Sequence, residues 1–344
     1  MTKLCYPRVI TRAVLGLLLL ATCATCGVQA GQVEAVETGP MRVFRDASGE
    51  SYFSLSLSAP QQPAGEAAAA KNIVVLFDTS ASQSGMYRET TLAALDSYLS
   101  KLAPTARVRL VAADLEARPL NGSFEPAEMV ADGAAEKLRG ETPLGSTDLA
   151  KALKSAAAML AGATGTTQVL YIGDGVSAAN LLDGPEFASV VRELRNAQIT
   201  VSSYAVGPER DAQLLAALAN QTGGNLYVDQ SMAWADDTAG VTLDRALQEN
   251  RRRGTEVGRT LADWAAGNVY WPEQVSLGGG VDVVYPVDVP PLRSDRDTVL
   301  LGRLTPNANT VNLAIKVANG SANQTLAVSR PTPQPAEALS LIHI

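Results

Sequence analysis

A short apolar run that ends in an acid and two hydroxyls constrains the fold of this chain more than any other stretch. Residues 74–82 read Val-Val-Leu-Phe-Asp-Thr-Ser-Ala-Ser. Consecutive apolar residues are typical of a strand buried on both faces. The polar residues then follow the carboxyl end of that strand, which is where open α/β sheets bind ligands. The stretch therefore predicts a parallel sheet with a polar site at its carboxyl edge.

Strand-like and helix-like segments alternate over residues 71–230. This alternation predicts an α/β fold, a doubly wound and mostly parallel sheet with helices on both faces. The predicted strands cover 73–77, 108–112, 168–172, 199–205 and 226–228, with a possible edge strand at 117–120. The predicted helices cover 86–102, 126–138, 185–196 and 211–219, and an Ala-rich helix ends near residue 161.

The flanks of this region have different patterns. Residues 31–70 contain a strand with apolar alternation at 52–58, followed by a linker rich in Pro, Gln and Ala. Residues 231–267 predict a helical connector. From residue 268 to 338 the pattern changes to period two, punctuated by Gly and Pro, which predicts a smaller β-rich, sandwich-like module.

Three loops that we expect at the carboxyl edge of the predicted sheet carry oxygen-bearing side chains. The first loop offers Asp78, Ser80 and Ser82, a second offers Thr147, and a third offers Asp174 between two glycines. Carboxylates and hydroxyls are hard ligands that suit Mg²⁺, Mn²⁺ or Ca²⁺ rather than zinc or copper. Taken singly, each residue also fits an ordinary role in a loop or a helix cap. Taken together and in this order, they favour a metal site.

These motifs resemble the von Willebrand factor type A domain with its metal-ion-dependent adhesion site. The resemblance rests on Asp-x-Ser-x-Ser, on Thr147 within Gly-Ser-Thr-Asp-Leu, and on Gly-Asp-Gly after a strand, and it covers residues 71–230. Residues 204–207 and 218–224 are similar to later parts of the same family. One departure is Ala81, where the family often has Gly, but that position contributes no ligand atom.

The resemblance implies a ligand set and a function. The ion, Mg²⁺ with Mn²⁺ or Ca²⁺ as alternatives, would be held by Asp78, Ser80, Ser82, Thr147 and Asp174, some of them through water. An Asp or Glu of a protein partner would complete the coordination shell, so the resemblance implies metal-dependent protein binding. The alternative is a scaffold subunit of an envelope assembly, in which the site binds a fixed or intramolecular partner or serves stability.

The flanks carry a second resemblance. Residues 52–60 and 292–303 are similar to the sequence around the type A domain in inter-alpha-trypsin-inhibitor heavy-chain-like proteins. A separate module at the front of those proteins has no counterpart here, so the match is partial. It implies that residues 268–338 form a β module that packs behind the metal domain.

The composition argues against several other functions. A net charge of −7 disfavours a nucleic-acid binder that relies on phosphate contacts. The single His, His343, lies in the last six residues, so Ser-His-Asp and Cys-His catalysis have no base. Zinc lacks Cys and His ligands, and no phosphate-binding Gly-x-x-x-x-Gly-Lys-Ser/Thr loop is present. A metal-dependent hydrolase ranks last because no general base stands out, and we expect a protein that is not an enzyme.

The two ends of the chain predict export and truncation. A basic start, an apolar core at 13–22 and a small-x-small site ending at Ala30 predict a signal peptide over residues 1–30. All three cysteines lie in that segment, and lipidation at Cys23 is the alternative that would bring membrane contact. We therefore expect an exported bacterial protein that is periplasmic, cell-surface or secreted. Residues 339–344 read as a translated sequencing-library end, which predicts that the chain is truncated.

Overall fold

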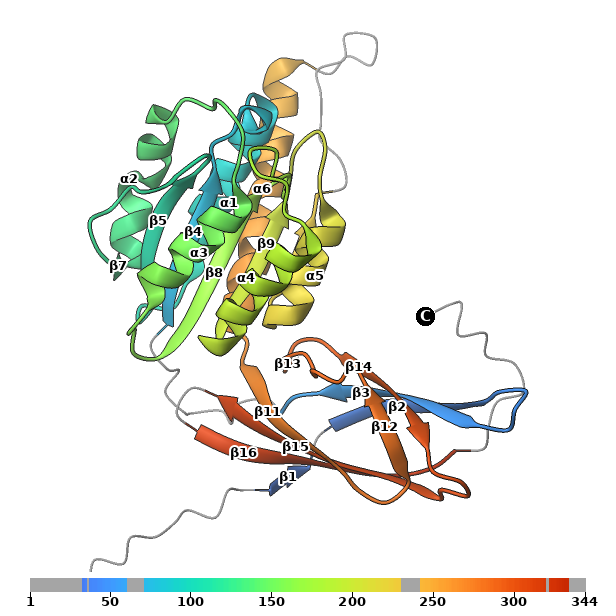
Figure 1. The fold of residues 1–344 in the computed structure, drawn as a ribbon. Helices are drawn as coiled ribbons and strands as arrows, with labels where there is room; N and C mark the ends of the chain where they lie inside the picture. The colour runs from blue at the N-terminus through green and yellow to red at the C-terminus, as the bar shows by residue number, and fades with distance from the viewer. Residues whose placement is uncertain (1–32, 36, 61–70, 230–241, 320–321, 334–344) are drawn as a thin grey trace, which may run out of the picture. The chain divides into compact units, whose positions relative to one another are not determined.

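The computed structural model of the chain describes residues 33–35, 37–60, 71–229, 242–319 and 322–333 (Figure 1). The predicted signal peptide, Cys23, and the predicted C-terminal artefact lie outside these described residues. Among the helices that the structure describes, none combines the length and the apolar character needed to span a membrane.

The central sheet confirms the predicted fold class. Its strand order is β10-β9-β8-β4-β5-β6, with β7 also pairing with β5. Strands β4, β5, β8, β9 and β10 are parallel, whereas β6 and β7 run antiparallel to β5. The bounds are β4 Lys71–Asp78, β5 Arg107–Ala113, β6 Ala117–Pro119, β7 Glu125–Pro126, β8 Thr166–Gly173, β9 Ile199–Ala205 and β10 Leu226–Val228.

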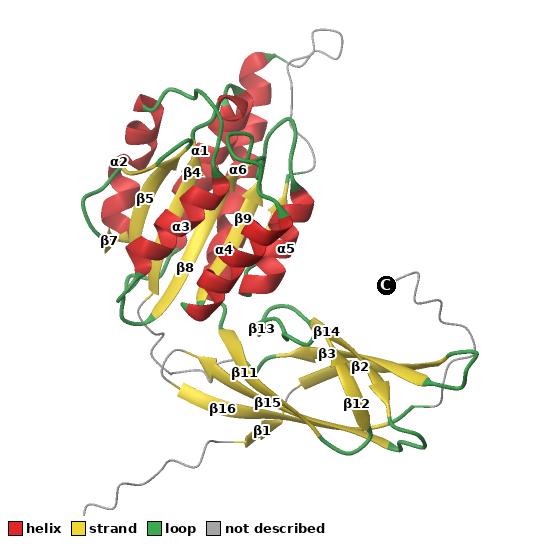
Figure 2. Cartoon of the chain, in the orientation of Figure 1, coloured by secondary structure: helices red, strands yellow, loops and turns green. Residues whose placement is uncertain are grey.

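Helices cover both faces of this sheet (Figure 2). Along β4, Ile73, Val75 and Phe77 pack in the cluster that contains residues of α1, α2 and α6. Val74 and Leu76 pack in the opposite cluster with residues of α3, α4 and α5. The uninterrupted apolar run thus reflects burial on both faces. The bounds are α1 Met86–Lys101, α2 Ala127–Gly140, α3 Leu149–Leu160, α4 Gly184–Asn196, α5 Ala212–Thr222 and α6 Leu243–Ala266.

Helix α6 packs tightly along α1. A Cβ atom on Gly254 would lie 2.3 Å from the carbonyl oxygen of Thr90, and one on Gly258 would lie 2.2 Å from that of Ala94. Only glycine permits this approach of the two backbones. Val257 of α6 is buried in the same core as α1. Helix α6 covers residues 243–266 of the predicted helical connector, and its buried side chains belong to the core of the α/β domain. Residues 231–241 of the predicted connector lie outside the described residues.

Both flanks of the α/β domain build one β sandwich. Its sheets have the orders β1-β16-β15-β11-β13 and β12-β14-β3-β2, and a single apolar core includes residues of both. The bounds are β1 Val33–Ala35, β2 Glu37–Arg45, β3 Ser51–Ser58, β11 Val269–Leu277, β12 Val281–Tyr285, β13 Leu292–Arg293, β14 Thr298–Leu304, β15 Thr310–Asn319 and β16 Ala322–Pro331.

The predicted leader strand does not stand apart from the C-terminal module. It corresponds to β3, in which Phe53, Leu55 and Leu57 are buried and the residues between them are half-buried. Strand β3 pairs antiparallel with β14, so the N-terminal and C-terminal flanks share a sheet. The α/β domain is thus inserted between β3 and β11 of the sandwich.

The position of β4 explains where a site can form. It lies between β5, which follows it through α1, and β8, which comes later in the chain. The chain goes from β4 to β5 on one side and later crosses over to β8 on the other, so the strand order reverses at β4. In open α/β sheets, ligands bind at the carboxyl ends of the strands at such a switch point. The loops after β4 and β8 meet at this edge, together with the loop that leads into α3.

Candidate metal site

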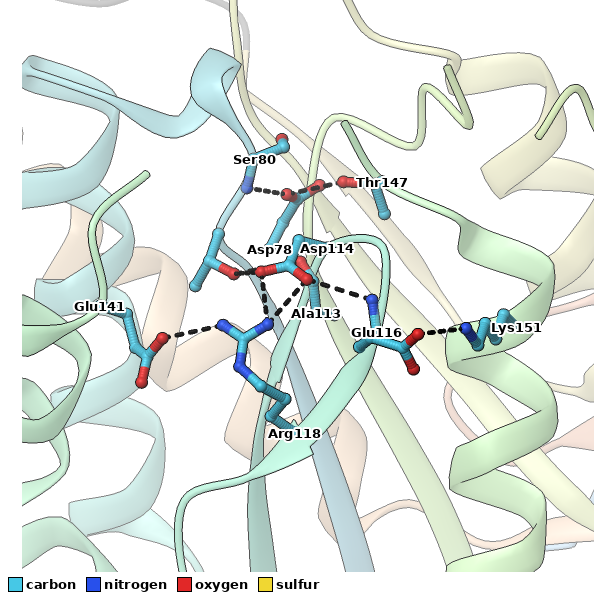
Figure 3. Close-up of polar contacts among 10 residues, drawn as sticks. Asp78, Ser80, Ala113, Asp114, Glu116, Arg118, Glu141, Thr147 and Lys151 are labelled. Carbon is cyan, nitrogen blue, oxygen red and sulfur yellow. Dashed lines mark hydrogen bonds and ion pairs between the residues drawn. The ribbon is translucent and has the colours of Figure 1, made fainter. Parts of the chain in front are cut away.

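Asp78 is the last residue of β4, and its side chain is fully buried. Its Oδ1 accepts a hydrogen bond from the backbone N–H of Ser80 at 2.8 Å and one from the hydroxyl of Thr147 at 2.9 Å (Figure 3). The first bond tightens the turn that follows the strand. The second joins this turn to the loop before α3.

The other predicted ligands complete a continuous cluster. The Oγ atoms of Ser80 and Ser82 are 3.0 Å apart, and the Ser82 hydroxyl donates to Oδ2 of Asp174. The other oxygen of Asp174 accepts the backbone N–H of Val176 at 2.8 Å. The structure therefore brings all of the predicted residues together, from three separate loops.

A pocket of about 250 Å³ opens over this cluster. Asp78 lies behind the pocket wall, whereas Asp174 reaches its surface, so the two carboxylates differ in depth. Glu209 also lines the pocket, and sequence reasoning did not single it out. The lining residues are Ser80, Ser82, Gly145, Ser146, Thr147, Asp174, Val176, Ala178, Pro208 and Glu209.

The electrostatics of the cluster favour a cation. Within the part of the chain that the structure describes, neither Asp78 nor Asp174 forms an ion pair. Burial raises the pKa of Asp78, and the negative charge of Asp174 raises that pKa further. Two buried carboxylates and three hydroxyls offer only oxygen donors, which fits a hard divalent ion. The residues present therefore suit Mg²⁺, Mn²⁺ or Ca²⁺.

Two further side chains contact the cluster, and the sequence analysis missed both. The hydroxyl of Tyr171 donates to Oδ2 of Asp78 at 2.7 Å. Nε2 of Gln83 donates to the carbonyl of Val206 at 3.0 Å and lies 3.4 Å from Oδ2 of Asp174. A signal for Tyr171 was available, because a tyrosine inside a strand buried on both faces needs a partner for its hydroxyl.

A second acidic group lies one strand away and has a different environment (Figure 3). Asp114 follows β5, and both of its oxygens lie 2.8 Å from Nη1 of Arg118. The Thr79 hydroxyl also donates to Asp114, at 3.0 Å. Burial alone would raise the pKa of Asp114, but the hydrogen bonds from Arg118, Glu116 and Thr79 hold that pKa below its usual value.

The sequence pattern of the von Willebrand factor type A domain matches residues 71–228. These residues form a von Willebrand factor type A domain. No curated protein sequence matches the chain. The likeness of the flanks to inter-alpha-trypsin-inhibitor heavy-chain-like proteins stays a prediction.

Solved structures share the fold at low identity. The von Willebrand factor type A protein from Catenulispora acidiphila is 12% identical with a TM-score of 0.60, and the match covers 90% of this chain and 76% of that one. The ArnB paralog VWA2 from Sulfolobus acidocaldarius is 12% identical with a TM-score of 0.50, covering 88% and 77%. The human COPII-coat protein Sec24c is 11% identical with a TM-score of 0.51, covering 81% and 46%. These matches extend beyond the type A domain into the β sandwich.

Proposed function

We propose that this chain is an exported, non-enzymatic protein that binds a protein partner through a divalent cation held by its type A domain. The observation that carries the proposal is the hydrogen-bonded cluster of Asp78, Ser80, Ser82, Thr147 and Asp174, of which all but Asp78 line one pocket. Members of this domain family act in protein interaction and assembly, and the oxygen cluster gives this member a means to do so.

The residues of the cluster divide into two roles. Ser80, Ser82, Thr147 and Asp174 line the pocket and would face the ion, whereas Asp78 lies behind them and adds negative charge. When bound, the ion supplies a positive charge and a coordination position that an outside carboxylate can fill. An Asp or Glu of the partner is therefore the expected contact.

The same pocket offers little chemistry beyond binding. Its lining contains carboxylates and hydroxyls, and the chain between residues 27 and 342 contains neither His nor Cys. A hydroxyl nucleophile therefore has no imidazole base near it. The net charge of −7 further favours a protein partner over a nucleic acid. The predicted signal peptide supports export to the periplasm, the cell surface or the medium.

The experiment measures cation binding and partner capture on the same protein. Calorimetric titration with Mg²⁺ should show a single site in the wild type and no binding in Asp78→Ala. Envelope proteins captured by the immobilised wild type in Mg²⁺ should elute with EDTA and should not bind Asp78→Ala. Asp114→Ala is the matched control and should behave like the wild type. Capture that survives both EDTA and Asp78→Ala would contradict the proposal.

A further inference from the structure

Tyr171 is the buried side chain through which β8 reaches the carboxylate at the end of β4. Its ring is fully buried, and its hydroxyl donates to Oδ2 of Asp78 at 2.7 Å. The phenolic oxygen accepts the backbone N–H of Gly175 at 3.1 Å. A phenol has one proton to donate. The bond from Gly175 therefore leaves that proton directed at Asp78.

The carboxyl group of Asp78 is held from two sides. Oδ1 accepts the Ser80 N–H and the Thr147 hydroxyl, and Oδ2 accepts the Tyr171 hydroxyl. Rotation of the carboxyl group about its Cβ–Cγ bond would break all of these bonds at once. Removing the Tyr171 hydroxyl would leave Oδ2 buried without this donor, and the rotation would become easier.

Two glycines permit this arrangement, one by leaving space and the other by its backbone conformation. A Cβ atom on Gly173 would lie 2.5 Å from the Tyr171 hydroxyl and 2.5 Å from Cβ of Asp78. Gly173 does not have a positive φ, so space rather than conformation requires glycine there. Gly175 has a φ of 77°, and this conformation turns its N–H toward the tyrosine. The segment from Tyr171 to Gly175 thus contains the phenol, the glycine that leaves space for it at position 173, and the backbone N–H at position 175 that donates to it.

We propose that Tyr171 is a positioning residue that fixes the orientation of Asp78 and links it to the loop carrying Asp174, thereby setting the affinity of the site for its cation. The inference rests on the proposed metal-dependent function. Tyr171 lies behind the pocket and does not line it, so it acts only through Asp78. Partners of this outer kind typically change metal affinity by about 10–100-fold.

Tyr204 provides a matched control on the neighbouring strand. It is also fully buried, and its hydroxyl donates to Oδ2 of Asp229 at 2.7 Å. Ile172 of β8 pairs with Tyr204 of β9, so the two tyrosines lie close in the same sheet. Asp229 follows β10 and does not line the pocket. A tyrosine-to-phenylalanine change at either position removes the same kind of hydrogen bond.

The test is a calorimetric titration of the mature chain with Mg²⁺ alone, paired with thermal melts in EDTA. Tyr171→Phe should weaken Mg²⁺ binding by about 10–100-fold. Tyr204→Phe should keep the wild-type affinity for Mg²⁺, even if it loses as much thermal stability as Tyr171→Phe. Tyr171→Leu, a second variant without the hydroxyl, should reproduce the loss of affinity.

The outcomes separate this inference from the proposed function. Wild-type affinity in Tyr171→Phe would overturn the inference while leaving the metal site intact. An equal loss in Tyr204→Phe would overturn it too, because general destabilisation would then explain the effect. Failure of both Tyr171 variants to fold would show that the hydroxyl serves the fold and not the cation. Absence of Mg²⁺ binding in the wild type would remove the proposed function itself.

Discussion

Asp78 and Asp114 lie at the carboxyl ends of adjacent parallel strands, and their charges are balanced in different ways (Figure 3). Asp114 is paired with Arg118 through both oxygens, and Arg118 in turn contacts Glu141 at 2.8 Å. Asp78 has only neutral donors, and its nearest charged neighbour in the cluster is another carboxylate, Asp174. The chain therefore neutralises one aspartate itself and leaves the other in need of an outside cation.

The difference shows that position at a sheet edge does not determine the role of an acid. Asp78 is the last residue of β4, and Asp114 is the first residue after the neighbouring strand β5. The pKa of Asp78 is raised because burial and Asp174 oppose its charge, whereas the pKa of Asp114 is lowered because hydrogen bonds, above all those from Arg118, outweigh burial. A buried carboxylate without a positive partner is costly unless an ion accompanies it.

The largest effect should come from removing the charge of Asp78 in the presence of the ion. At Mg²⁺ concentrations about 100 times the dissociation constant, bound ion stabilises the fold by about 2.7 kcal/mol. In Mg²⁺, Asp78→Asn should lower the free energy of unfolding by this amount. In EDTA the loss should be much smaller, because the substitution also removes a buried charge beside Asp174. Urea unfolding in both conditions measures the difference. Asp114→Asn should lower the free energy of unfolding by the same amount in Mg²⁺ and in EDTA. An equal loss in the two conditions for Asp78→Asn would contradict the idea that Asp78, unlike Asp114, depends on a cation.

A positive side chain placed within the cluster should turn the Asp78 environment into one like that of Asp114. Ser82 contacts Asp174 and lines the pocket, so the ammonium of Ser82→Lys can reach the Asp174 carboxylate. We expect the free energy of unfolding in EDTA to rise by about 1 kcal/mol, and the stabilisation by Mg²⁺ to disappear. Ser155→Lys on α3 adds the same charge elsewhere and should retain the response to Mg²⁺. A response that persists in Ser82→Lys would argue against a cation between the carboxylates.

Removing Arg118 should make Asp114 resemble Asp78 without affecting the metal site. Arg118 is 45% exposed, so Arg118→Met should lower the free energy of unfolding by only about 0.5–1 kcal/mol. The loss should be the same in Mg²⁺ and in EDTA, as measured by urea unfolding. Arg139→Met is the control, because Arg139 makes a longer, 3.9 Å contact with Glu89 and is 55% exposed. A change in Mg²⁺ affinity in Arg118→Met would show that the two clusters are coupled.

The smallest effect is a pH dependence that belongs to Asp114. Its folded-state pKa is lowered from 3.8, so it binds a proton less readily in the folded than in the unfolded protein. Its contribution to stability is therefore present above the unfolded pKa and is lost as pH falls through the folded pKa. The difference in stability between the wild type and Asp114→Asn should shrink as pH falls below about 4, the unfolded pKa of an aspartate. A difference that stays constant over this range would mean that the charge of Asp114 contributes nothing.

The parts of the site that could be predicted are those determined by local sequence. Thr147 lies in the loop between α2 and α3, ahead of a helix that the sequence predicts. Asp78 ends a strand that is recognisable from its apolar run, Ser80 and Ser82 follow it, and Asp174 follows a second parallel strand. Parallel strands place such loops at one edge whatever the side-chain details. The contacts of Tyr171 and Arg118 were not predictable in this way, because they depend on where the tip of a long side chain ends.

Longer-range packing explains what the sequence left open in the fold. The pattern of α6 predicts a helix, but only the facing carbonyls of α1 show why Gly254 and Gly258 are glycines. Likewise, the alternation in β3 predicts a half-buried strand and says nothing about which strand pairs with it. Its partner β14 lies beyond the whole α/β domain, and no local pattern encodes that distance.

The inserted position of the α/β domain also has a consequence for the order in which the two parts of the chain fold. The hydroxyl of Ser56 in β3 bonds to Asp297, 241 residues later in the chain. The α/β domain forms most of its contacts within its own segment and can fold first. Strand β3 can pair with β14 only after β14 has been synthesised. Pairings of such large sequence separation are slow to form. We therefore expect the edge of β3 that faces β14 to stay unpaired until late in folding.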